Sequence, residues 1–389
     1  MTRLKSLFAF LLISFVFLSA ASAEILIDET YDFSMDIPEG YELKENSPDS
    51  NSYCFEHPNI PVTFVLKVVT DTKMYSTYSA LSDSLNKLNA QREMDSTVWN
   101  DTSCSIANIE FTLDQKYSGW AVSAPLAKDN TFVVLLCYSP SSQYEKCVNF
   151  ILATLNSLCV SADYYNTPGI ITTYAYPKLG NHKYTVDIGN KNISFLLDDA
   201  DIEASEFVIN MEYAVLILYA KHNLWQEAWQ RYYRMIYRDC FGRLENFSDK
   251  VINTLFEEGR LQNPDNPELY FAQQLLTWTQ GFEYERLKNR STDLTSPVAA
   301  VVGDGNDCDC RSLLICILAR ASGIESILLI SNEYSHAMPA IEINALGQKY
   351  IPAGTDREFI MGETTAPVTW GLISADMQDR EKWIPVYLP

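Results

Sequence analysis

The sequence has few histidines, few basic residues and no long hydrophobic run inside the chain. Only four of the 389 residues are histidine, which excludes a histidine-rich metal store. Lys and Arg number 29 against 50 Asp and Glu, so the formal net charge is −21. Nucleic acids and anionic lipid surfaces both bind basic faces, and this charge therefore argues against either as a partner. Beyond the first 23 residues, no stretch is apolar over the roughly 20 residues that a membrane-spanning helix needs.

The composition is that of a globular protein, with 47% hydrophobic and 20% charged residues. The length predicts two domains. The first 23 residues are expected to be a signal peptide, because Arg3 and Lys5 precede the apolar run 7–18 and a small-residue Ala-Ser-Ala site ends at Ala23. We therefore expect an exported protein, periplasmic or secreted, that keeps no stable membrane anchor after cleavage near Ala23.

Nine cysteines follow the predicted cleavage site, in a compartment that permits disulfides. Because the number is odd, at least one thiol must be free or paired between molecules. The spacing does not determine any pairing. A free thiol in such a compartment is either incidental or a nucleophile, and its sequence context has to distinguish the two.

Residues 24–160 are expected to form a small α+β domain. Strand-like runs begin at 31–38 and 60–69, a helical pattern covers 76–92, and an amphipathic helix over 143–158 closes the unit. The order Ile-Pro-Glu-Gly-Tyr, Gly-Trp-Ala-Val and Phe-Ile-Leu-Ala-Thr-Leu-Asn-Ser resembles small PsbP-like α/β sandwich domains. No combination of catalytic residues is visible here, so we expect this domain to have a binding or positioning role.

Residues 161–200 are predicted to be a connector, and residues 201–389 a second domain. From 202 to 290 apolar residues recur every three and four positions, which is typical of amphipathic helices. The Trp and Tyr residues within 224–237 could form a carbohydrate platform, but their helical spacing favours a core position. Asn266 followed by Pro267 marks the start of a helix that runs to Thr279.

The segment Gly303-Asp-Gly-Asn-Asp-Cys-Asp-Cys-Arg-Ser-Leu-Leu places Cys308 where a loop becomes a helix. Unpaired N–H groups and the helix dipole favour a thiolate at such a position, which predicts a lowered pKa for Cys308. The same N–H groups could stabilise an oxyanion during acyl transfer. Gly323 is expected to end this helix.

A histidine and two carboxylates follow in a suitable order. A buried strand is predicted over 324–331, and His336 opens the next strand, 28 positions after Cys308. One helix, one strand and one turn separate the two residues, and this connection can return the imidazole to the helix start. Glu363 or Asp356 could then orient the imidazole through its second nitrogen, and we favour Glu363.

Together, Asn306-Asp-Cys-Asp-Cys-Arg-Ser-Leu-Leu, Trp278-Thr-Gln, His336-Ala and Glu363-Thr-Thr-Ala resemble the transglutaminase-like superfamily of papain-type cysteine enzymes. The resemblance covers residues 266–366, and 200–389 in outline. It implies an α+β class with helices followed by an antiparallel sheet. It also implies a set of roles: nucleophile Cys308, general base His336, third triad member Glu363 with Asp356 as the alternative, and oxyanion ligand Gln280. The chain departs from the family at Cys310, where an acid is usual, and at Met338-Pro339.

Other readings of the same residues stay open. Cys308 and Cys310 could be structural thiols, one of them in a disulfide with a distant cysteine. A metal site of Cys308, Cys310 and His336 lacks an evident fourth ligand, and C-x-C is not the usual zinc spacing. The nearby acids lack the spacing of an EF-hand, and Cys316 is expected in the core. We therefore expect no metal and no cofactor.

The sequence leads to two functional hypotheses of different classes. The first is an exported, cysteine-dependent enzyme that transfers acyl groups at the amide bonds of a peptide or protein substrate. Hydrolysis by a peptidase or amidase is favoured, and transfer to an amine, as in a protein-crosslinking transglutaminase, is the alternative. The second hypothesis is a non-catalytic binding or scaffold protein on the same fold.

Overall fold

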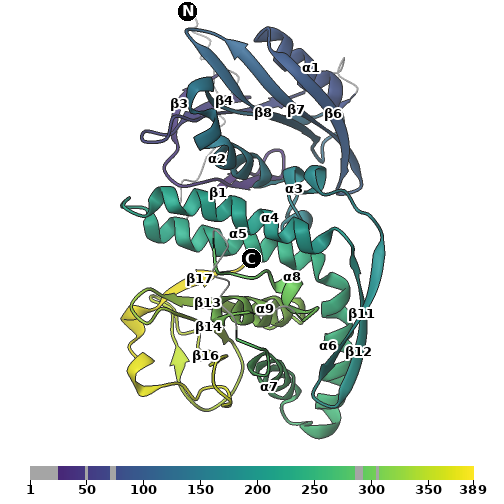
Figure 1. Cartoon of the computed structure of the whole chain (residues 1–389), viewed down its shortest axis with the longest axis vertical. Helices are drawn as coiled ribbons and strands as arrows, with labels where there is room; N and C mark the ends of the chain where they lie inside the picture. The colour runs from purple at the N-terminus through teal and green to yellow at the C-terminus, as the bar shows by residue number, and fades with distance from the viewer. Residues whose placement is uncertain (1–24, 49–50, 71–75, 285–291, 304–305) are drawn as a thin grey trace, which may run out of the picture.

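The computed structural model describes residues 25–48, 51–70, 76–284, 292–303 and 306–389. The predicted signal peptide lies outside these residues. The chain is an α+β protein with antiparallel sheets, which confirms the expected class at this level. Figure 1 shows two α/β units, one above and one below, with a pair of long helices between them. No helix in the described ranges is long and apolar enough to cross a membrane.

The upper unit is built on a seven-stranded sheet in the order β3-β4-β5-β9-β8-β7-β6. Its strands are β3 (Glu42–Asn46), β4 (Ser52–Glu56), β5 (Thr63–Val69), β6 (Gln91–Trp99), β7 (Thr102–Thr112), β8 (Lys116–Pro125) and β9 (Phe132–Pro140). Helix α1 (Thr77–Lys87) covers one face and α2 (Tyr144–Asn156) the other. The alternation of the strands gives both faces an apolar surface, so each helix buries its own hydrophobic cluster.

A smaller three-stranded sheet also belongs to the upper unit and has the order β1-β2-β10. Its strands are β1 (Ile25–Asp28), β2 (Phe33–Asp36) and β10 (Leu158–Cys159). The short helix α3 (Ile170–Ala175) follows. Strand β2 occupies the centre of the strand predicted over 31–38, and its buried residues join the same core as α2.

Helices α4 (Asp201–Leu216) and α5 (Trp225–Arg243) form the middle layer and contribute to both units. Met211 and Val215 of α4 belong to the core of the upper unit, whereas Val208 and Ile209 belong to that of the lower unit. Most of the aromatic stripe of α5 is core, as the helical spacing predicts: Tyr232, Tyr233 and Tyr237 are buried.

Buried arginines on one face of α5 bind the upper unit. Arg234 makes a bidentate pair with Asp36, at 2.7 and 3.0 Å, and Arg231 pairs with Glu212 of α4 and donates to the backbone carbonyl of Asp36. Arg238 donates to three backbone carbonyls, those of Ser157, Leu158 and Thr167. A charge buried in this way is tolerated only when it is paired or fully hydrogen-bonded, so these contacts fix the geometry between the units.

One acid in this interface has no such partner. Glu39 is buried, and neither of its carboxyl oxygens makes a hydrogen bond within the described residues. His57 and the Tyr219 hydroxyl both bond its backbone carbonyl instead, at 3.1 and 2.6 Å. Burial raises the pKa of Glu39 from 4.5 to about 8, against the lowering effect of Arg231 and Arg234.

In the described part of the chain, the lower unit consists of a β-hairpin, a group of helices and a five-stranded sheet. The hairpin is β11 (Asn181–Ile188) and β12 (Lys191–Asp198), and the helices are α6 (Glu245–Gln262), α7 (Pro267–Gln280), α8 (Pro297–Ala300) and α9 (Cys308–Ala321). The sheet has the order β15-β16-β14-β13-β17, from β13 (Ser326–Ser331), β14 (His336–Ile341), β15 (Lys349–Tyr350), β16 (Phe359–Met361) and β17 (Ile384–Tyr387). The hairpin lies in the stretch predicted as a connector, and its apolar residues join the lower core.

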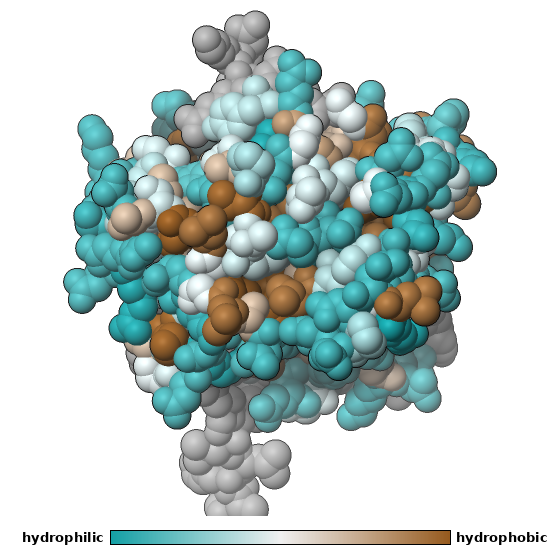
Figure 2. Space-filling view, turned by 90° about the horizontal axis from the view of Figure 1, so that it is seen from below, coloured by the Kyte–Doolittle hydropathy of each residue, from teal (hydrophilic) through white to brown (hydrophobic). Residues whose placement is uncertain are grey.

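The underside of the molecule is mixed in polarity. Figure 2 shows small apolar patches separated by hydrophilic residues on this face. Apolar surface that is divided in this way is ordinary for a folded protein.

Candidate active site

Helix α9 is the central element of the lower unit. Its residues from Cys310 to Ala319 are all buried, among the other helices and the sheet. Asp307 caps the helix, because its side chain accepts the backbone N–H of Cys310 at 3.1 Å. Cys308 is therefore the first residue of the helix, at the position predicted from the sequence, and α9 ends at Ala321 with Gly323 just beyond in a left-handed conformation.

His336 and Glu363 lie together on neighbouring parts of the sheet. His336 is the first residue of β14, and Glu363 follows the end of β16, which pairs with β14. The two oxygens of Glu363 lie 3.2 and 3.1 Å from Nε2 of His336. Although burial alone would raise it, the pKa of Glu363 is held below its usual value by His336 and by Thr365.

The loop that carries Glu363 is tightly fixed. The Thr365 hydroxyl and backbone N–H both donate to Oε1 of Glu363, at 2.6 and 2.7 Å. Gly362 lies against the ring of Trp370, where a β-carbon would come within 2.6 Å of a ring carbon. A larger residue cannot occupy this position without displacing the loop, so glycine here sets where the carboxylate stands.

Arg311 connects the loop of Glu363 to the loop that precedes Cys308. It is buried in α9 and donates to the Asn306 side chain at 2.7 Å, to the Thr364 carbonyl at 3.1 Å and to the Phe282 carbonyl at 2.8 Å. It thus joins three segments around the site. The motif that singled out Cys308 in the sequence also contains Arg311, but it predicted no role for this residue.

The side chain of Gln280 binds the loop that carries Glu363, which corrects the oxyanion role expected for it. Both hydrogens of its side-chain amide are used, because Nε2 donates to the carbonyls of Glu363 and Val368, at 2.8 and 2.9 Å. In this geometry it anchors the acid-bearing loop and has no free hydrogen for an oxyanion. Asp356, the alternative acid, is exposed before β16, and no hydrogen bond among the described residues joins it to His336.

The thiol of Cys308 differs most from expectation. Its sulfur donates to Oδ1 of Asp309 at 3.3 Å, and in the described part of the chain no hydrogen bond joins it to the imidazole of His336. Burial raises the pKa of Cys308, and the charges of Asp309 and Asp307 act in the same direction, opposed by the backbone of Ala337. The prediction of a lowered pKa is therefore wrong for this conformation, because burial takes the thiolate out of water and the carboxylates of Asp309 and Asp307 add negative charge at the helix terminus.

The other cysteines do not form a competing centre. All nine are free thiols, and eight are buried. Cys310 and Cys316 lie in the core of α9, and burial raises the pKa of Cys316 to about 12. Within the described ranges, no group of three or more His, Cys, Asp or Glu side chains is arranged to hold a metal ion.

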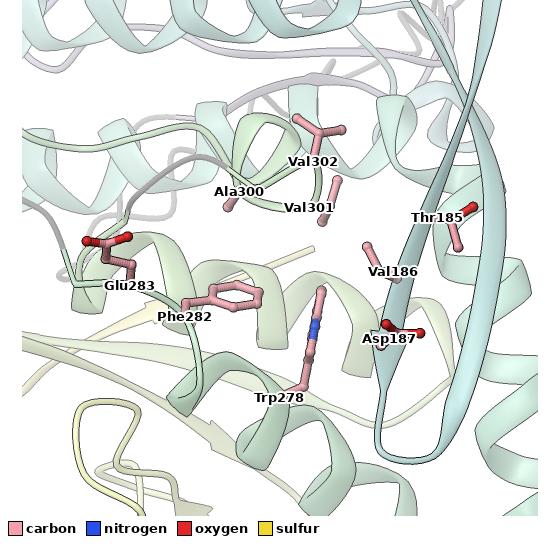
Figure 3. A pocket seen from close by; sticks show the side chains of 10 residues that line it. Thr185, Val186, Asp187, Trp278, Phe282, Glu283, Ala300, Val301 and Val302 are labelled. Atoms are coloured by element: carbon pink, nitrogen blue, oxygen red, sulfur yellow. The ribbon is translucent and has the colours of Figure 1, made fainter.

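An open cavity of about 320 Å³ lies beside this region, between β11, the end of α7 and α8. Figure 3 shows Trp278 and Phe282 on one side and Val186 and Val301 opposite. Phe282 is also the residue whose carbonyl binds Arg311. Neither Cys308 nor His336 is among the lining residues, so the cavity neighbours the site without containing its chemistry.

Comparisons with known proteins leave the family open. No protein-family model matches the chain, and no curated protein matches it. Among solved structures, the chain is similar to the cyanobacterial PsbP protein of Synechocystis sp. PCC 6803, at 9% identity over 38% of this chain and 98% of that one, with a TM-score of 0.31. The Ran-binding protein Mog1p of Saccharomyces cerevisiae matches at 12% identity over 35% of this chain and 94% of that one, with a TM-score of 0.27.

A longer but weaker similarity is to a protein of Bacteroides thetaiotaomicron VPI-5482. It covers 83% of this chain and 87% of that one, at 11% identity and a TM-score of 0.21. Similarities of this size carry no argument about function. The first one shows only that a PsbP-like structure is among the neighbours of this fold.

Proposed function

We propose that the chain is an exported, cysteine-dependent enzyme that transfers acyl groups at amide bonds, a peptidase or amidase with a papain-like core of transglutaminase-like type. The observation that supports it is the convergence of three elements. The start of α9 brings Cys308 to the backbone of Ala337, while the adjacent His336 is held by Glu363 at 3.1 Å. Nucleophile, base and orienting acid in this order are the parts of a catalytic triad.

The proposed reaction proceeds in two steps. The sulfur of Cys308 attacks the amide carbonyl carbon, His336 accepts the thiol proton, and the C–N bond breaks as that proton passes to the leaving amine. Water then attacks the thioester with His336 as base, which releases the carboxylic acid and restores the thiol. The backbone N–H of Cys308 serves as oxyanion donor. An amine in place of water would give the crosslinking reaction of a transglutaminase.

The state of the thiol favours a second candidate, a non-catalytic scaffold. Cys308 is only 2% exposed, and its thiol binds a carboxylate rather than the imidazole. Cys310 also occupies the place of an expected acid. In a non-catalytic scaffold, the reactivity of the Cys308 thiol is not expected to depend on His336. Such a dependence therefore distinguishes the enzyme from the scaffold.

The experiment is alkylation of the folded protein by iodoacetamide, followed by peptide mass mapping. We expect slow labelling of Cys308 in the wild type, and His336→Ala to slow it further by about tenfold or more, because the imidazole stabilises the reactive thiolate. Cys316, which is fully buried in the same helix, is the internal control and is expected to remain unlabelled. Equal rates for Cys308 in both proteins would overturn the enzyme proposal in favour of the scaffold.

A further inference from the structure

The Cys308 thiol is one end of a short chain of hydrogen bonds that runs through Asp309 to Tyr233. Its sulfur donates to Oδ1 of Asp309 at 3.3 Å, and the hydroxyl of Tyr233 donates to Oδ2 of the same carboxylate at 2.5 Å. Tyr233 is buried in α5, so the second donor stands on a fixed element. Each oxygen of Asp309 is thereby occupied, and the carboxylate is fixed facing the thiol.

The charges around the thiol reinforce this arrangement. Asp307 caps α9 and Asp309 lies in its first turn, so a thiolate would be a third negative group at one helix end. Arg311 is one turn away, but its guanidinium is directed to Asn306 and to two backbone carbonyls. Tyr233 stays a neutral donor, because burial and Asp309 raise its pKa well above the ordinary value. The paired His336 and Glu363 face the site from the sheet.

We propose that Asp309, fixed by Tyr233, is a latch that holds the proton of Cys308 and restrains the nucleophile until the thiol turns toward His336. The inference rests on the proposed function, since it concerns the regulation of the same site. Asp309 is a positioning residue here, because it acts on Cys308 and on no substrate atom. Only the thiolate is a good nucleophile, so the latched thiol resists alkylating and oxidising agents while no substrate is bound.

The test compares the pH dependence of iodoacetamide labelling at Cys308 in the wild type, Asp309→Asn and Asp309→Ser. Both variants remove the charge, the first with the same shape and the second with a smaller polar side chain. We expect the labelling midpoint to fall by at least about one pH unit, which corresponds to about tenfold faster labelling near neutral pH. The matched control, Asp265→Asn, removes an exposed acid before α7 and is expected to leave the midpoint unchanged.

The outcome separates the latch from the enzyme proposal when each variant is combined with His336→Ala. An unchanged midpoint in both folded Asp309 variants overturns the latch, even where His336→Ala still slows labelling and the acyl-transfer proposal stands. Conversely, faster labelling in the Asp309 variants with no effect of His336→Ala supports a thiol restrained by Asp309 and overturns its activation by histidine. Circular dichroism spectra that match the wild type establish that each variant is folded.

Discussion

The buried carboxyl of Glu39, which makes no hydrogen bond within the described residues, makes the stability of the protein depend on pH in a defined direction. In the folded chain its pKa is about 8, against 4.5 for an ordinary glutamate. An unfolded chain therefore loses this proton near pH 4.5, whereas the folded chain keeps it to about pH 8. The favourable contribution of the protonated form is complete below the lower pKa and is lost as the pH rises to the higher one.

The size of the effect follows from the two pKa values. At about 1.4 kcal/mol for each pKa unit, a rise from 4.5 to about 8 corresponds to about 5 kcal/mol. The substitution Glu39→Gln keeps the shape of the side chain and removes the titration. We therefore expect the variant to resemble the wild type below the lower pKa and to be more stable by up to about 5 kcal/mol above the higher one.

The assay is urea denaturation of both proteins across this pH range, with a reductant present so that the nine thiols stay reduced. Taking the difference between variant and wild type removes the contribution of groups that are common to both. Glu45→Gln, on the exposed strand β3, is the matched control and is expected to show no such trend. A difference for Glu39→Gln that stays constant with pH would refute the argument that this carboxyl is buried without a partner.

Four further outcomes test the site and its helix. Arg311→Met is expected to lower the free energy of unfolding by about 3 kcal/mol or more, because three acceptors lose a charged donor; urea denaturation measures it. Gln280→Leu leaves two carbonyls without their donor, so a loss of about 2 kcal/mol is expected in the same assay, and no loss would show that water replaces the amide. Leu314→Ala, fully buried in α9, should cost about 2–5 kcal/mol, measured by thermal or urea unfolding. Glu363→Gln is expected to be less stable than the wild type at neutral pH, because His336 no longer binds a charged acid. This difference in unfolding free energy should shrink as the pH falls through the lowered pKa of Glu363, and a difference independent of pH would contradict the argument.

Elements with a strong local pattern were predictable from the sequence. The N-cap at Asn266 and the following proline place the start of α7 correctly, because capping depends on residues next to one another. The apolar stripe of α9 and the continuous apolar run of β13 were predictable for the same reason, because their buried residues form a pattern within one short segment. Strand β6 was missed, since it is an exposed edge strand rich in charged residues whose pairing with β7 is a long-range contact.

The candidate site was also predictable only in part. The order of Cys308, His336 and Glu363 along the chain could be read from motifs, and the pairing of β14 with β16 explains how the imidazole and the carboxylate meet. The direction in which the Cys308 thiol points could not be predicted from the sequence. It depends on Asp309, which is fixed by Tyr233, a residue 76 positions away. A second signal was present locally: two aspartates flank Cys308, and their charges oppose the effect of the helix terminus.

The shared helix pair α4 and α5 has a consequence for the ancestry of the chain. Each helix gives side chains to both cores, and the arginines of α5 bind backbone carbonyls that belong to the upper unit. A genetic break at residue 160 or 200 would leave the upper unit without the residues that close its core, such as Met211 and Val215. The two units are therefore not interchangeable modules, and we expect recombination to transfer them as one inherited block.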